Sequence, residues 1–283
     1  MYLIADSGST KCDWMLLKDN KEVEAFSTMG FNPFFHNETV ISTAIKDNTE
    51  LTKYADEVKF IFLYSAGCSS KELKLVVECG LKQVFTKANI YVDHDLVGAA
   101  YSTYSGQPGI TCIIGTGSNS CFFDGQNVSE EVPALGYILG DEGSGSYFGK
   151  KLLSDYLYKK LPVEINSWLQ DELKLTKKEI LENVYMKPHA NVYLASFMKI
   201  YATFKENPYV KSTVAAGMNH FLMNHVCCFA NYNAVPVHFI GSIAFHFEDI
   251  LRAESKKLGI EVGNIIKKPI DGLVDYHLKY LIK

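Results

Sequence analysis

The sequence lacks an excess of basic residues. Its 283 residues include 28 Lys and Arg against 32 Asp and Glu, so the formal net charge is −4. Proteins that bind nucleic acid or anionic lipid usually carry a basic patch or tail. We therefore expect no nucleic-acid partner and favour a small-molecule ligand.

Long hydrophobic runs are also missing. No stretch approaches the roughly 18–20 apolar residues that span a bilayer. The first residues run directly into a strand pattern, without the basic and cleavage features of a signal peptide. With 47% hydrophobic and 21% charged residues, the chain is too apolar for a disordered protein. We expect a globular, cytoplasmic protein with no membrane partner.

The seven cysteines make neither a CxxC pair nor a zinc-ligand pattern with histidine. They are scattered, mostly in apolar context: Cys12, Cys68, Cys79, Cys112, Cys121, Cys227 and Cys228. A cysteine in such a context behaves as a small hydrophobic residue. This distribution favours a reducing compartment over a disulfide framework.

Two glycine-rich turns of similar design stand about a hundred residues apart. Asp6-Ser7-Gly8-Ser9-Thr10-Lys11 follows the apolar run 2–5, and Gly115-Thr116-Gly117-Ser118 follows the apolar run 111–114. A second strand pattern follows each turn, which is typical of a hairpin. Small residues leave backbone N–H groups uncovered, and such groups can bind phosphate oxygens. Either turn alone is more often an ordinary hairpin turn, but the pair indicates a duplicated fold that binds one polyphosphate.

Strand and helix patterns alternate over residues 1–105. We predict strands near 2–6, 11–17, 22–28, 58–64 and 90–92, with a hairpin turn at 19–20. We predict one helix over 38–52 with Asn37 as its cap, a second that begins after Ser69 or Ser70, and a third over 96–101. The turn cluster 105–109 marks a domain boundary.

The pattern restarts after this boundary. We predict strands near 110–114, 119–123, 236–240 and 260–265, a helical segment over 141–231, and helices over 245–258 and 270–281. Such alternation is typical of an α/β fold with mixed sheets. The predicted domains are residues 1–105 and 106–269, with a terminal helix at about 270–283 packed back on the first.

Two acidic residues stand at the ends of predicted strands. Asp6 could hold Mg²⁺, directly or through water. Asp95 stands where a strand leads into a helix, and its carboxylate could accept a proton from a hydroxyl nucleophile, a contribution of ~10²–10⁴ in rate. The local pattern alone favours another role for Asp95, that of a helix N-cap contributing about 1 kcal/mol.

A third glycine-rich segment, Gly140-Asp141-Glu142-Gly143-Ser144-Gly145, opens the long helical region. Its acids would complement a helix dipole, but it has more glycine than a cap needs. It could therefore hold hydroxyl groups or metal-bound water. A fourth signal, Gly241-Ser242, would let a flat ring approach the backbone after the late strand.

In this order, the motifs resemble those of the acetate and sugar kinase, Hsp70 and actin superfamily, and within it the BadF/BadG/BcrA/BcrD ATPase family, N-acetylglucosamine kinase branch. Residues 6–11 and 114–119 are similar to the two phosphate motifs, 140–145 to the Gly-Asp-Glu-Gly-Ser signature of that branch, and 239–243 to the adenosine motif. The resemblance covers nearly the whole chain. It implies two ribonuclease H-like domains, an actin-like ATPase duplication, with a cleft between them.

The resemblance also implies roles for particular residues. It makes Asp95 the catalytic base and lets Asp6 hold Mg²⁺ through water. It assigns the binding of ATP to Asp6, Gly8, Ser9, Thr10, Lys11, Gly115, Thr116, Gly117, Ser118, Gly241 and Ser242. It assigns the binding of the sugar to Asn32, Ser65, Gly67, Asp95, Thr116, Gly140 and Asp141. One departure is Leu135-Gly136-Tyr137, where the family often has Gly-Trp-Gly before the signature, and it affects the expected N-acetyl pocket.

The implied activity is the ATP- and Mg²⁺-dependent phosphorylation of an amino sugar, N-acetylglucosamine, by a homodimer. Glucosamine or another cell-wall sugar stays open as the substrate. Two alternatives come from other classes: an ATPase that activates a partner enzyme, and a sugar sensor without turnover. Activators of this family hold an iron–sulfur cluster with cysteines, and the scattered cysteines of this chain do not favour that function.

Overall fold

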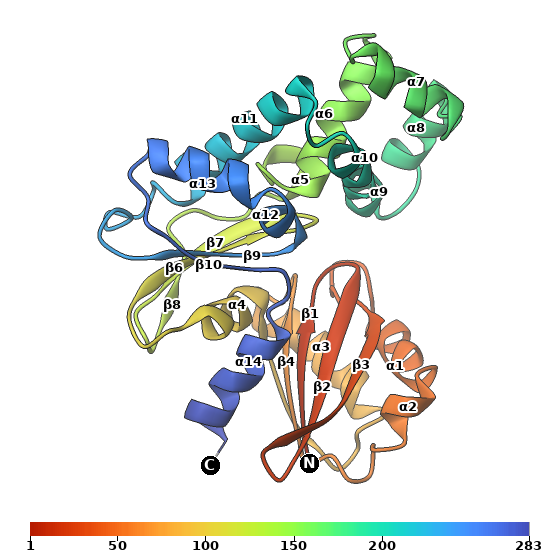
Figure 1. Ribbon diagram of the computed structural model, residues 1–283. Coiled ribbons are helices and arrows are strands. Elements are labelled where there is room, and N and C mark those ends of the chain that lie inside the picture. Colours follow the sequence, from red (N-terminus) through yellow and green to blue (C-terminus); the bar gives the residue numbers. More distant parts are fainter. Residues whose placement is uncertain (283) are drawn as a thin grey trace. The chain divides into compact units, whose positions relative to one another are not determined.

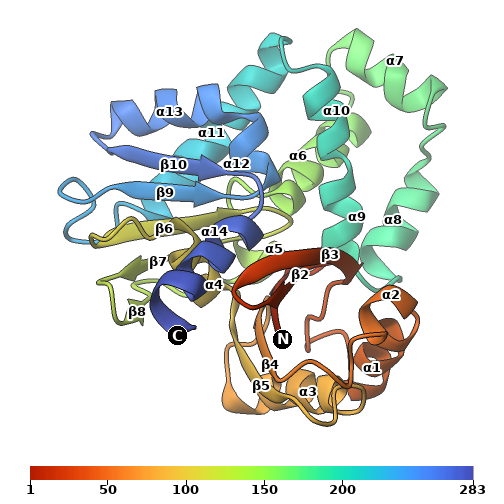
Figure 2. The same cartoon turned by 60° about the horizontal axis from the view of Figure 1, so that its bottom comes forward.

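The computed structural model describes residues 1–282, so Lys283, the last residue of the predicted terminal helix, lies outside the described residues. The chain forms two compact units. The first is Met1–Gln107 together with the C-terminal segment from Lys268, and the second is Pro108–Lys267. Each unit is built on one five-stranded sheet with helices packed on it (Figure 1, Figure 2).

The first unit contains strands β1 (Tyr2–Ser7), β2 (Lys11–Lys18), β3 (Lys21–Met29), β4 (Phe60–Ser65) and β5 (Asn89–His94). Its helices are α1 (Glu38–Lys46), α2 (Thr49–Thr52), α3 (Lys71–Lys82), α4 (Asp95–Thr103) and α14 (Ile270–Tyr276), and a π-helical turn follows over His277–Leu281.

Alternating side chains of the first sheet fill two cores. Leu3 and Ala5 of β1 pack in a core with α1 and α3, whereas Ile4 packs in a second core with Leu273 and Val274 of α14. Helices α14 and α4 lie side by side, because Gly272 allows its helix to approach the Ser102 carbonyl closely. Helices therefore cover both faces of the first sheet. Because β1, β4 and β5 run parallel, their carboxyl ends lie at one edge of this sheet.

The second unit contains strands β6 (Gly109–Ile114), β7 (Ser118–Phe123), β8 (Val128–Ser129), β9 (Val237–Ile240) and β10 (Val262–Ile266). Its helices are α5 (Gly136–Leu139), α6 (Gly145–Leu157), α7 (Val163–Asp171), α8 (Lys177–Tyr185), α9 (Ala190–Ser196), α10 (Met198–Thr203), α11 (Pro208–His225), α12 (Ser242–His246) and α13 (Glu248–Lys257).

The two sheets have the same topology. Their strand orders are β3-β2-β1-β4-β5 and β8-β7-β6-β9-β10, so the third, second, first, fourth and fifth strands of each unit follow one another. In both units the first three strands are antiparallel and the last two pair in parallel. The predicted α/β duplication is therefore confirmed.

Several predicted helices are interrupted. The helix expected over 38–52 is two helices, since Asn48 caps a new one at the Leu51 backbone N–H. The helix over 245–258 breaks at Phe247, and the terminal one changes to a π-helical turn at His277. The suggested N-cap role of Asp95 is wrong: His94 occupies that position, and Asp95 is the first helical residue. None of the helices over residues 1–282 is long and apolar enough to cross a membrane.

Candidate active site

The first glycine-rich turn joins β1 to β2 and is closed by a hydrogen bond from the Gly8 N–H to the Lys11 carbonyl, 2.9 Å long. Gly8 and Thr10 are exposed, and Ser9 is half-buried. Gly30 lies directly against this turn, because a Cβ at that position would stand 1.9 Å from the Gly8 carbonyl oxygen. The turn therefore has exposed backbone on one side and a tightly fitted support on the other.

The segment that carries Asn32 is fixed to the same turn. The Phe31 N–H donates to Ser7 Oγ (2.8 Å), and Asn32 Nδ2 donates to Ser9 Oγ (3.3 Å). Ser65 is fully buried, and its hydroxyl donates to the Phe31 carbonyl (3.1 Å). The structure thus brings Ser9, Asn32 and Ser65 together, although Ser65 supports the segment from beneath.

Gly67 lies directly against the Asn32 side chain. Its φ of +82° is in the region that favours glycine, and a Cβ there would stand 2.3 Å from Asn32 Oδ1. Asn32 itself is only 7% exposed. A side chain at position 67 would therefore displace the Asn32 amide.

Asp6 and Asp95 interact electrostatically at the carboxyl edge of the first sheet. The pKa of Asp6 is raised to about 7, mainly because burial disfavours its charged form, and further by the charges of Asp95 and Asp13. Burial also raises the pKa of Asp95, and His94, whose Nε2 is 3.2 Å from the carboxylate, opposes this shift. Carboxyl groups with raised pKa values at one sheet edge are typical of functional sites.

An ion-pair cluster beside Asp6 was missed by the sequence reasoning. Asp13 is the cross-strand neighbour of Asp6 in the β1–β2 pair. Its Oδ1 accepts from Lys11 Nζ (2.5 Å), and its Oδ2 is 3.2 Å from Lys268 Nζ. Hairpin register could have located Asp13, but Lys268 is distant in sequence and no local pattern indicates it.

The second glycine-rich turn joins β6 to β7 in the other unit. The Gly115 N–H donates to the Gly117 carbonyl (2.9 Å). A Cβ at Gly115 would meet no described atom within 4 Å, so this face of the turn is open. Gly241, with φ of +118°, fits against the start of the turn, since a Cβ there would stand 2.3 Å from the Ile114 carbonyl oxygen. Ser242 follows at the start of α12.

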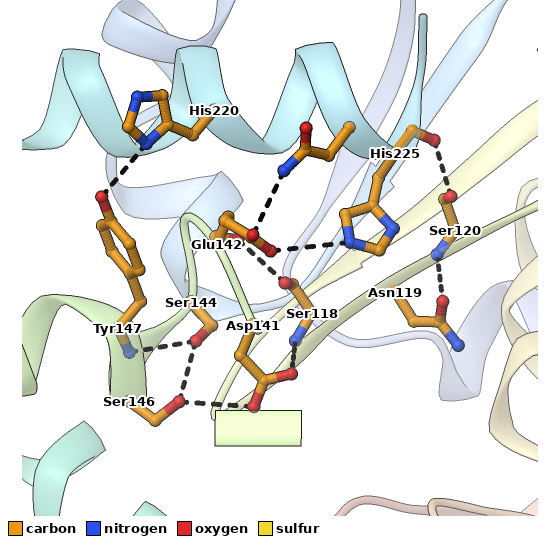
Figure 3. Close-up of polar contacts among 11 residues, drawn as sticks. Ser118, Asn119, Ser120, Asp141, Glu142, Ser144, Ser146, Tyr147, His220 and His225 are labelled. Carbon is orange, nitrogen blue, oxygen red and sulfur yellow. Dashed lines mark hydrogen bonds and ion pairs between the residues drawn. The ribbon is translucent and has the colours of Figure 1, made fainter. Parts of the chain in front are cut away.

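Asp141 ties the third glycine-rich segment to this turn (Figure 3). Its φ is +58°, and its Oδ1 accepts from the Ser118 N–H (3.2 Å) while its Oδ2 accepts from Ser146 Oγ (3.4 Å). Asp141 is 8% exposed, and burial raises its pKa, an effect that these two donors oppose. Its carboxylate therefore positions the turn within this unit.

Backbone hydrogen bonds extend the same junction. The Gly145 N–H donates to the Gly115 carbonyl (2.8 Å), and the Ser146 N–H donates to the Thr116 carbonyl (3.0 Å). Gly140 precedes this region and ends the short helix α5. The structure thus places Asp141, with Gly140 directly before it, beside the turn that carries Thr116.

Helix α11 supports the segment from behind, a contact that the sequence did not indicate. Glu142 accepts from Asn224 Nδ2 (3.1 Å) and lies 3.8 Å from His225 Nε2, and the His225 carbonyl accepts from Ser120 Oγ (2.6 Å) (Figure 3). Helix α11 therefore contacts both the third glycine-rich segment, at Glu142, and the strand that follows the second turn, at Ser120.

Metal chemistry at this site would use few protein ligands. Within residues 1–282, no group of three or more His, Cys, Asp and Glu side chains is placed to hold a metal ion. Mg²⁺ usually keeps several waters and uses one or two carboxylates together with substrate phosphates. The half-buried Asp6 carboxyl next to an exposed turn fits that requirement.

The duplicated sheet with a glycine-rich hairpin turn after the first strand of each copy defines the class of actin-like ATPase folds. A glucokinase of the ROK family from Streptomyces griseus, solved with glucose and AMPPNP, shares this fold with a TM-score of 0.55 over 97% of each chain, at 13% identity. The chain belongs to the BadF/BadG/BcrA/BcrD ATPase family, whose model matches residues 5–223.

Named relatives cover different shares of the chain. A proposed N-acetylglucosamine kinase from Porphyromonas gingivalis is 36% identical, with a TM-score of 0.93 over 100% of both chains. Another from Chromobacterium violaceum has a TM-score of 0.70 at 15% identity, over 97% of this chain and 98% of its own. An N-acetyl-D-glucosamine kinase from Dictyostelium discoideum is 31% identical over 141 residues, which are 48% of this chain and only 43% of that relative.

Proposed function

We propose that this protein transfers the γ-phosphoryl group of ATP to a hydroxyl of an amino sugar, N-acetylglucosamine. The observation that carries the proposal is that Asp6 and Asp95 both stand at the carboxyl edge of the first sheet, where Asp6 leads into an exposed glycine-rich turn. The names of the Porphyromonas and Dictyostelium relatives support the choice of sugar.

Asp95 acts as the general base in this proposal. Its carboxylate accepts the proton of the attacking sugar hydroxyl, the hydroxyl oxygen bonds to the γ-phosphorus, and ADP leaves with the electrons of the broken bond. Asn32, in the segment pinned to Ser9 and supported by Ser65, orients the sugar by hydrogen bonding. Gly67 leaves the space that the Asn32 amide needs.

The remaining assigned residues of each unit contact ATP or the sugar. In the first unit, Gly8, Ser9, Thr10 and Lys11 bind phosphate oxygens. In the second, Gly115, Thr116, Gly117 and Ser118 do so, Gly241 and Ser242 contact the adenosine, and Thr116, Gly140 and Asp141 border the sugar. Asp6 would hold Mg²⁺ through water, and the ion would neutralise phosphate charge there. A cytoplasmic, reducing location fits the seven cysteines, which form no disulfide over the described chain.

A sugar panel tests this function. ADP release from Mg-ATP is measured with N-acetylglucosamine, glucosamine, N-acetylmannosamine and glucose, and we expect the highest kcat/KM with N-acetylglucosamine. A preference for glucosamine would reassign the substrate. ATP binding without ADP release on any sugar would contradict the kinase and favour a sensor. A brown, iron-containing preparation would favour the activator.

A further inference from the structure

Lys268 is the second lysine at the first glycine-rich turn, although it lies 257 positions after Lys11 in the numbering. Its ammonium group and that of Lys11 contact opposite oxygens of the Asp13 carboxylate, at 3.2 and 2.5 Å. Asp13 is only 18% exposed at its side chain, whereas Lys11 and Lys268 are 51% and 52% exposed. A partly buried carboxylate therefore holds two exposed cations next to the turn.

Acidic residues surround this pair of lysines. Asp13 and Asp95 both raise the pKa of Asp6, so two further carboxyl groups act electrostatically on Asp6, and Lys268 acts on it in the opposite direction. Ionised carboxyl groups beside the turn would repel a polyphosphate. Lysines at the same place reverse that effect, since an ammonium group binds phosphate as a point charge.

The residues that directly follow Lys268 are held in helix α14, whereas the side chain of Lys268 itself is half exposed. Lys268 is followed by Pro269, whose carbonyl accepts from the Leu273 N–H in the first turn of α14. Helix α14 is in turn locked against α4 through Gly272 and Ser102. A half-exposed side chain of four methylene groups can reorient from Asp13 to a bound anion while α14 keeps its place on α4.

We infer that Lys268 binds the terminal phosphates of the nucleotide together with Lys11, and that Asp13 stores both ammonium groups when no nucleotide is bound. This inference rests on the proposed function for the identity of the anion, a nucleoside polyphosphate. It adds a binding residue from the C-terminal segment to a turn that is otherwise built from residues 6–11.

The sequence provides a matched control. Lys267 has the same charge, but its ammonium group lies over the Phe245 ring, 5.9 Å from the centroid, and both residues belong to the second unit. Lys267→Gln and Lys268→Gln therefore make the same chemical change at adjacent positions, and only the second removes a cation from Asp13.

Calorimetric titration of ATP, ADP and AMP, without sugar, tests the inference. For Lys268→Gln we expect the Kd of ATP to rise by about tenfold, the Kd of ADP to rise less, and the Kd of AMP to change less than about twofold, because a charge-assisted contact is lost only with the terminal phosphates. Lys268→Arg should restore most of the ATP affinity, and Lys267→Gln should bind all three nucleotides like the wild type.

Other outcomes would overturn the inference. Equal losses for ATP and AMP, or a lower Tm with unchanged nucleotide affinities, would make Lys268 an anchor of the C-terminal segment only. A wild type that binds no nucleotide would overturn both this inference and the proposed function. A wild type that binds ATP but phosphorylates no sugar would overturn the proposed function and leave the Lys268 test intact.

Discussion

The Ser118 N–H donates a hydrogen bond to the Asp141 carboxylate, over 3.2 Å, and thereby joins the second glycine-rich turn to the Gly-Asp-Glu-Gly-Ser segment of the same unit. Asp141 adopts φ of +58°, a conformation that Asp and Asn tolerate better than most residues. This bond gives a structural reason for an acid at position 141, in addition to its proposed place near the sugar.

Replacing Asp141 tests how much this hydrogen bond contributes to stability. Asp141→Ala leaves the buried Ser118 N–H without its acceptor, so we expect the free energy of unfolding to fall by about 1–3 kcal/mol. Asp141→Asn keeps an acceptor oxygen and tolerates the backbone conformation, so its loss should be clearly smaller. Urea denaturation of the wild type and both variants measures the difference. Equal stability of Asp141→Ala and the wild type would show that the hydrogen bond contributes nothing.

Alanine substitutions at two glycines of the second unit should affect different properties, ATP affinity at Gly115 and stability at Gly241. Gly115→Ala places a methyl group in open space at an ordinary φ, so we expect a stability change within about 0.5 kcal/mol. The same methyl group covers the proposed phosphate-binding face, and the Kd of ATP should rise by on the order of tenfold, the equivalent of one lost hydrogen bond. Thermal unfolding and ATP titration measure the two effects.

Gly241→Ala is the counterpart. Its Cβ would stand 2.3 Å from the Ile114 carbonyl oxygen at φ of +118°, and such strain costs on the order of 1–3 kcal/mol or more. We expect a lower Tm before any effect on nucleotide binding is considered. If Gly115→Ala were the more destabilising of the two, the geometry of this turn would be wrong.

The sugar side of the first unit can be tested at Gly67. Gly67→Ala would push the Asn32 amide away, because the new Cβ would stand 2.3 Å from Asn32 Oδ1. We expect the KM for the sugar to rise by about tenfold or more, the equivalent of one lost hydrogen bond, with the Kd of ATP nearly unchanged. Steady-state kinetics with varied sugar, together with ATP titration, checks this. A selective loss of ATP affinity would instead assign Asn32 to the nucleotide.

The raised pKa of Asp6 predicts a pH dependence of stability. The folded protein binds the Asp6 proton up to about pH 7, whereas the unfolded chain releases it near 3.8. The folded state therefore holds more protons between these values, and this group makes stability fall as the pH rises from about 4 to 7. Asp6→Asn removes the effect, so its stability relative to the wild type should increase across that window.

Urea denaturation at pH 4.5 to 8 measures this dependence. Asp95→Asn serves as the second variant, because loss of the Asp95 charge lowers the pKa of Asp6 and should narrow the window from its upper end. A stability difference between Asp6→Asn and the wild type that is the same at every pH would contradict the assignment.

Local sequence patterns predicted the strands and both glycine-rich turns, because hairpins and buried strands depend on neighbouring residues. Asn37 and Ser70 cap helices as their positions indicate. The contacts that build the site are different in kind. The bonds of Ser65 to Phe31, Ser120 to His225 and Asp13 to Lys268 join residues that are 34, 105 and 255 positions apart.

Long-range contacts of this kind depend on strand order and helix packing, which a single sequence does not encode locally. Asp95 illustrates the point. Its strand-to-helix position allowed either a cap or a base, and the resemblance favoured the base. The structure removes the cap role by placing His94 at the N-cap, and it places Asp95 within electrostatic reach of Asp6.

The central claim is that the Asp95 carboxylate accepts the proton of a sugar hydroxyl during phosphoryl transfer from ATP. The most direct measurement compares ADP release with N-acetylglucosamine for the wild type and Asp95→Asn, alongside ATP titration of both. We predict that kcat falls by ~10²–10⁴ in the variant while ATP still binds. Turnover close to that of the wild type, with ATP binding intact, would contradict the claim.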